Sequence, residues 1–130
     1  MLKEFSLIII IIICVVGFNF FIQDYLEDSS KDFISQLDEL SEKLLEKDNI
    51  DYDAIKKEVD ELEKKWYDVE GMWMLIILHS ELDKVDAAFK ELRATLDIED
   101  LDNSYVNIKK LEFLIESVTK KDLFELKNIF

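Results

Sequence analysis

His79 is the single histidine of the chain, and its spacing from two aspartates is the pattern closest to a metal site. On a helix, Asp83 and Asp86 follow on the same face, whereas Glu81 points roughly 200° away. A metal ion would need further ligands from a facing helix, and the sequence has no Glu-x-x-His pattern. We therefore predict no metal site, and interpret the group as a hydrogen bond between His79 and an aspartate at the rim of a helical core.

General-base catalysis by His79 would require a nucleophile or a substrate cleft. The sequence has no Gly-x-Ser-x-Gly motif, and its single cysteine, Cys14, lies in an apolar run. Two glycines leave no phosphate-binding loop of the Gly-rich kind. We therefore predict that the protein is not an enzyme, with no catalytic residues, no cofactor and no small-molecule substrate.

A group of large apolar residues is better suited to protein contacts. Residues 72–78 (MWMLIIL) are apolar on every side and too short to cross a bilayer, so we expect them to be buried in the domain or in an interface. Tryptophan is a good interface anchor. The candidate interaction surface comprises Trp66, Met72, Trp73, Met74 and His79. At helical spacing, however, both tryptophans are expected to belong to the core, and a partner-binding patch near the turn is the functional alternative.

The charge balance excludes several classes of partner. The 130 residues include 16 Lys+Arg and 30 Asp+Glu, which gives a net charge of −14. Binding to a phosphate backbone is driven by Lys and Arg, so we predict no nucleic-acid partner. The acidic segment 97–103 lacks the glycine of a calcium loop and is interpreted as a solvated loop.

Residues 5–22 contain no charged side chain and would form a helix about 27 Å long, close to the ~30 Å hydrocarbon core of a bilayer. Lys3 precedes this run and Asp24 follows it, which predicts a single span of the cytoplasmic membrane with the N-terminus inside and the following domain outside. A cleaved signal peptide is the alternative, although no pair of small residues follows the run. The residues taken to represent the anchor are Leu7, Ile10, Ile13, Val16, Phe18 and Phe21.

Beyond the apolar run, hydrophobic residues recur every three or four positions, which predicts an all-α fold. The expected buried stripes include Phe33 and Leu37, then Val59 and Leu62, then Leu75, Leu78 and Leu82. Either Asp51 or Asp53 can cap the helix that contains the second stripe. We expect a membrane anchor with its flanks at residues 1–28 and an acidic extracytoplasmic domain at 29–130. The domain is predicted to be a small antiparallel bundle, with a coiled-coil oligomer as the alternative. A phase shift near Gly71 predicts a turn at 70–72. The expected helices are 30–47, 51–69, 72–96, one from 104, and a short C-terminal helix at 120–128 begun by a capping box at Thr119.

Three features resemble one bacterial family: the N-terminal membrane helix with Trp66 after it, the HSELD segment at 79–83, and the LKNIF segment at 126–130. The family is that of domain of unknown function 4363, and the likeness spans nearly the whole chain. The resemblance implies a single-span membrane protein of Gram-positive bacteria with a helical outer domain. It implies no activity and no site residues.

The sequence thus predicts a membrane-anchored structural or interaction protein. Its expected partners are the lipid bilayer and either another membrane protein or a second copy of the chain. The alternative is a secreted helical binding domain released by cleavage of the N-terminal segment.

Overall fold

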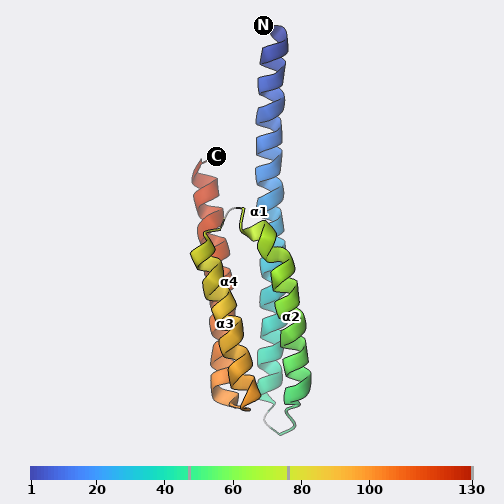
Figure 1. Cartoon of the computed structure of the whole chain (residues 1–130), viewed down its shortest axis with the longest axis vertical. Coiled ribbons are helices and arrows are strands. Elements are labelled where there is room, and N and C mark those ends of the chain that lie inside the picture. The colour runs from blue at the N-terminus through green and yellow to red at the C-terminus, as the bar shows by residue number, and fades with distance from the viewer. Residues whose placement is uncertain (47, 76, 130) are drawn as a thin grey trace.

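The computed structural model shows a bundle of four helices with one helix extended far beyond it (Figure 1). It describes the backbone of residues 1–46, 48–75 and 77–129, and the side chains of the same residues up to 120. The helices are α1 (Leu2–Leu45), α2 (Tyr52–Trp73), α3 (His79–Asp97) and α4 (Leu101–Ile129), and the described residues form no strand. The predicted all-α class, with an N-terminal apolar helix and an antiparallel bundle, is confirmed.

Helix α1 is a single helix of 44 residues that includes both the apolar run and the first helix of the bundle. The boundary expected between residues 28 and 29 therefore lies inside a continuous helix. One face of α1 is buried from Ile22 onward, because apolar or small residues recur there every three or four positions. That buried face consists of Ile22, Leu26, Ser30, Phe33, Leu37, Leu40, Ser41 and Leu44.

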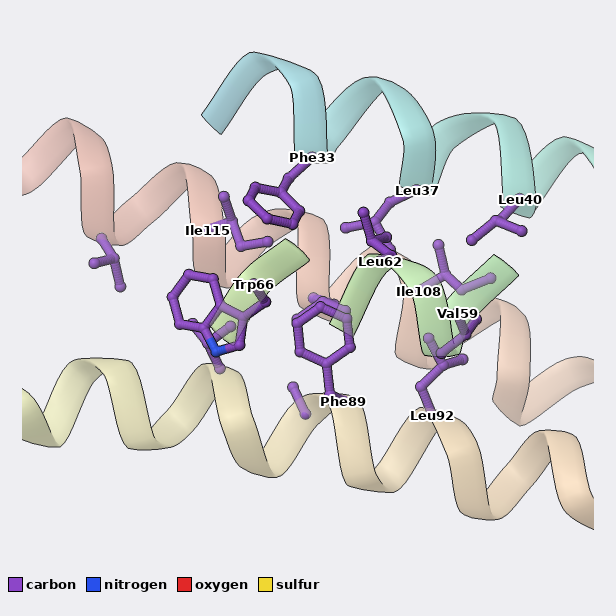
Figure 2. Close-up of a cluster of buried hydrophobic side chains, with 14 of the residues drawn as sticks. Phe33, Leu37, Leu40, Val59, Leu62, Trp66, Phe89, Leu92, Ile108 and Ile115 are labelled. Carbon is purple, nitrogen blue, oxygen red and sulfur yellow. The ribbon is translucent and has the colours of Figure 1, made fainter. Parts of the chain in front are cut away.

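The four helices run alternately up and down, and each contacts two neighbours, in the order α1, α2, α3, α4 and back to α1. Figure 2 shows how their apolar stripes meet, with Phe33 and Leu37 from α1 facing Trp66 from α2 and Phe89 from α3. Of the two candidate caps of α2, Asp51 is the one that serves, because its carboxylate accepts a hydrogen bond of 3.1 Å from the backbone N–H of Ala54.

The turn between α2 and α3 lies later than predicted. Gly71 is inside α2, and the chain turns only after Trp73, so a single helix over 72–96 was a wrong expectation. The predicted stripe included Leu75 and Leu78, but both side chains are exposed. Trp73 and Ile77 are buried instead, and the backbone N–H of Ile77 donates to the carbonyl of Trp73. Residues 72–78 include no polar residue, so the sequence could not show which of their side chains face the core.

The separate C-terminal helix is also corrected, because α4 continues without a break through 120–128 to Ile129. Thr119 does not cap a new helix. Its hydroxyl donates back to the carbonyl of Ile115 at 2.8 Å, as a hydroxyl in the middle of a helix can do.

The loop expected at 97–103 is shorter than predicted. Glu99 takes the left-handed conformation (φ 54°) after α3, and Asp100 accepts a hydrogen bond from the backbone N–H of Asn103.

Candidate functional site

The N-terminal part of α1 is an apolar rod that no other helix covers over most of its length (Figure 1). It is long and apolar enough to cross a membrane, a property that a signal sequence shares. The six residues taken to represent the anchor are all exposed, by between 37% and 64%. An isolated helix with large apolar side chains on every side is unstable in water, so this segment requires an apolar environment. These exposed residues are Leu7, Ile10, Ile13, Val16, Phe18 and Phe21.

The turn between α2 and α3 lies at the end of the bundle from which this rod emerges (Figure 1). The indole Nε1 of Trp73, the last residue of α2, donates a hydrogen bond of 3.0 Å to the Ser29 hydroxyl in α1. The Ser29 hydroxyl in turn donates to the carbonyl of Tyr25, one helical turn earlier, at 2.7 Å. The end of α2 is thus fixed to α1 a short distance beyond the apolar run.

The structure divides the candidate interaction surface into a buried and an exposed part. Trp66 and Trp73 are fully buried, with their rings edge to face and 5.1 Å between centroids, and Phe33 packs against both. They belong to the core, as their helical spacing predicted, and neither is accessible to a partner. Met72 is partly buried, whereas Met74 is exposed. Leu75 and Leu78, which the sequence placed in the core, are exposed beside Met74.

His79 begins α3, and its side chain is 71% exposed. Its Nε2 lies 3.6 Å from the nearest carboxylate oxygen of Asp83, which is too far for a hydrogen bond. The expected hydrogen bond at the rim of the core is therefore not formed with Asp83, and the pair attracts only when His79 is protonated. Glu81 instead pairs with Lys84 at 3.2 Å. Within the described residues, no three His, Cys, Asp or Glu side chains are grouped in a way that could hold a metal ion.

Asp86 is directed toward the core rather than toward His79, because it accepts the indole hydrogen bond of Trp66 at 2.5 Å. Glu70, which is only 8% exposed, is close enough to Asp86 for their charges to interact. Burial, and then the negative charge of Asp86, raise the pKa of Glu70 above its ordinary value. This pair was not predicted from the sequence. A signal was present, because Glu70 occupies the position between Trp66 and Trp73 on the buried stripe of α2.

A groove of about 330 Å³ lies between α1 and α4 near the same end of the bundle. Its polar floor is formed by the hydroxyls of Ser30 and Thr119, 3.2 Å apart. The charges on its rim are paired within each helix, Lys31 with Glu27 and Lys120 with Glu116. This groove therefore offers a ligand neither a net charge nor an unpaired polar side chain among these residues.

The comparisons with known proteins agree with the resemblance seen in the sequence. The family model described as domain of unknown function (DUF4363) matches residues 20–129. No curated protein and no solved structure matches the chain. The match begins near the end of the apolar run. It includes α1 from residue 20 and the whole of α2, α3 and α4. The chain therefore belongs to the family of domain of unknown function DUF4363.

Proposed function

We propose that this protein is a single-span membrane protein whose acidic bundle acts in structure or interaction on the outer face of the cytoplasmic membrane. The observation that carries the proposal is the continuity of α1, which passes from the uncharged run into the core of the bundle without a break. A rod of 44 residues is about 66 Å long, enough to cross a bilayer and still supply a full bundle helix.

Permanent anchoring is favoured over cleavage by where the buried face of α1 begins. Ile22, at the end of the apolar run, is 3% exposed, and Leu26 is fully buried. A signal peptidase cuts shortly after an apolar run, in extended chain with small side chains. In this protein the residues that follow the apolar run are helical, and Ile22 and Leu26 are part of the core. Cleavage there would therefore detach a helical turn that packs in the bundle.

The proposed orientation follows from the charges that flank the run. Lys3 lies before it, whereas Asp24, Glu27 and Asp28 lie after it with no base before Lys31. Basic residues are retained on the cytoplasmic side, which supports a bundle on the outer side of the membrane.

Contacts with another membrane protein or a second copy are supported by exposed apolar residues on the side of α4 that faces away from the core of the bundle. Phe113 is 67% exposed and Val106 is 57% exposed, and their spacing of seven places them on one stripe of the helix. Large apolar side chains that remain uncovered on a stripe are suited to helix-to-helix contact.

Membrane insertion and orientation can be tested together in cells. In a Cys14→Ala background, Ile98→Cys places a thiol on an exposed residue at the end of the bundle far from the apolar rod. We expect full-length protein in the membrane fraction after alkaline carbonate extraction, and labelling of Ile98→Cys by a membrane-impermeant maleimide on intact cells. Cys14 in the otherwise unchanged chain is the matched control and should stay unlabelled. A mature chain that lacks residues 1–22, or labelling only after lysis, would overturn the anchor or its orientation.

The interaction role needs a separate experiment. A photo-crosslinking residue at Phe113 should give a discrete adduct in intact cells, either with a second copy or with another membrane protein. The same residue at Ala87, which is exposed on α3, is the control and should give none. If Phe113 gives no adduct and no self-association, the stripe on α4 is not a contact surface.

A further inference from the structure

The turn between α2 and α3 presents three exposed apolar side chains within five residues. Met74 is 45% exposed, Leu75 is 60% exposed and Leu78 is 67% exposed. No charged residue lies between Glu70 and His79. Apolar side chains this close together, with no polar residue among them, mark a surface that meets another apolar medium.

Two buried residues hold this turn in place. Trp73 is fully buried and Ile77 is 3% exposed, so each exposed part of the turn directly follows a residue fixed in the core. The backbone N–H of Met74 donates to the carbonyl of Glu70, and that of Ile77 to the carbonyl of Trp73. The outward direction of Met74, Leu75 and Leu78 is therefore a fixed property of the turn.

The position of the turn relative to the apolar rod identifies the medium. Ser29, which accepts the indole hydrogen bond of Trp73, lies seven residues beyond Ile22, or about 10 Å along the helix axis. Helix α2 runs toward the rod, so the turn that follows Trp73 is closer still to the end of the apolar run (Figure 1). The polar layer of a bilayer extends roughly 5–8 Å beyond each side of its hydrocarbon core. With the rod in a membrane, the turn lies at the level of this layer.

We propose that Met74, Leu75 and Leu78 insert into the surface of the bilayer that α1 crosses, so that the bundle is held against the membrane at two points. The inference rests on the proposed function, since it requires α1 to span that bilayer. A lipid surface is favoured over a protein partner because the turn lies beside α1, at the end of the bundle from which the apolar rod emerges. Two attachment points fix the tilt of the bundle, which a single helix leaves free to vary.

Spin labels on the full-length protein in nanodiscs of phosphatidylglycerol and phosphatidylcholine test this contact. The Cys14→Ala background would carry one of four changes: Leu75→Cys, Leu78→Cys, Ile98→Cys or Ile10→Cys. Leu75, Leu78 and Ile98 are all exposed apolar residues in turns, but Ile98 is at the opposite end of the bundle. Ile10 lies inside the apolar rod and reports whether α1 is in lipid. Each label is scored by its collision rate with oxygen, which concentrates in lipid, against a water-soluble nickel chelate.

We expect the oxygen-to-nickel ratio at positions 75 and 78 to exceed that at 98 by about threefold or more, as for side chains buried 5–10 Å into the interface. If positions 75 and 78 match 98 while 10 reports lipid, the contact is absent but the anchor stands. If position 10 also reports water, the proposed function itself is wrong. Labels at 75 and 78 that neither reagent reaches would mean that protein covers the turn, which also overturns the proposal. All three exposed sites should give the far-UV circular dichroism of the parent chain.

Discussion

The indole Nε1 of Trp66 in α2 donates a hydrogen bond to the Oδ1 atom of Asp86 in α3, 2.5 Å away. Trp66 is fully buried, so this is the bond that satisfies its indole N–H inside the core. The acceptor is a carboxylate, and charge-assisted hydrogen bonds are stronger than neutral ones. The pair therefore fixes α2 against α3 beside the turn that joins them.

Asp86→Ala is expected to lower the free energy of unfolding by about 1–2 kcal/mol. The loss of a hydrogen bond to a charged group, which leaves a buried donor unpaired, costs roughly 1.5–3 kcal/mol, and relief of the repulsion from Glu70 offsets part of it. Urea denaturation in detergent, followed by far-UV circular dichroism, measures the difference. Asp86→Asn keeps an acceptor and should lose less. Asp83→Ala, whose side chain is 59% exposed, is the control and should change stability by less than about 0.5 kcal/mol. Equal losses for Asp86→Ala and Asp83→Ala would contradict this role.

The free energy of unfolding should depend on pH through the protonation of Glu70. Burial and the charge of Asp86 raise its pKa in the folded state above the unfolded value of about 4.5. The folded state therefore binds the proton more tightly, and stability falls as the pH rises through 4.5 toward the raised pKa. Glu70→Gln removes this loss, so it should be more stable than the parent at pH 7 by about 0.5 kcal/mol or more, on the scale of a like-charge pair.

Below pH 4.5 the advantage of Glu70→Gln should vanish, because the parent is then protonated as well. Denaturation midpoints taken at steps between pH 4 and pH 8 measure this trend. Asp68→Asn removes an exposed acid from the same helix and is the matched control. If both variants change stability equally at every pH, the effect would be one of net charge and not of the Glu70 environment.

Helix type and the buried stripes could be read from the sequence because their period is fixed by helix geometry. The stripe that includes Phe33 and Leu37, and the one that includes Val59 and Leu62, are both buried as expected. The N-cap of α2 was narrowed to Asp51 or Asp53, since a carboxylate before an apolar stripe accepts a backbone hydrogen bond there, and Asp51 makes that bond. These features depend on local spacing alone, which is why they were predictable.

The turn and the candidate surface were less predictable because they depend on tertiary packing. In the stretch from Met72 to Leu78 every residue is apolar, so periodicity could not show which side chains face the core. Which of these side chains face the core is determined by Trp73, whose indole N–H donates a hydrogen bond to the Ser29 hydroxyl in α1. The apolar N-terminal segment and the first bundle helix form one helix for a related reason, since no glycine, proline or capping bond interrupts residues 23–29.

The continuity of α1 predicts that the bundle depends on residues before position 29. Leu26 is fully buried and Ile22 nearly so, although both lie in the segment expected to serve only as anchor. Leu26→Ala should cost about 2–5 kcal/mol, the usual range for a buried leucine. Chemical denaturation of the full chain in detergent measures the cost. Leu2→Ala, at a position that is 85% exposed, is the control and should have no effect on bundle stability. A bundle of residues 29–130 that unfolds at the same urea concentration as the full chain would contradict the prediction.

Two ion pairs between neighbouring helices are expected to differ in strength because their surroundings differ. Arg93 in α3 lies 2.8 Å from Asp60 and 2.9 Å from Glu63 in α2, and the Glu63 side chain is only 10% exposed. Lys110 in α4 lies 3.0 Å from Glu91 in α3, but both side chains are about half exposed. Arg93→Ala should therefore lower the free energy of unfolding by about 1–3 kcal/mol, because it leaves the carboxylate of Glu63 nearly buried without a cation.

Lys110→Ala should cost less than about 1 kcal/mol, the usual range for a solvent-exposed pair. The two variants remove the same sign of charge, so a comparison of their urea midpoints isolates burial from net charge. Adding Glu63→Gln to Arg93→Ala should recover part of the loss, since the second change removes the charge that the first one left unpaired. High salt should reduce the effect of Lys110→Ala more than that of Arg93→Ala, because exposed pairs are screened more strongly. Equal costs for the two single variants, with no recovery in the double variant, would show that Glu63 does not depend on Arg93.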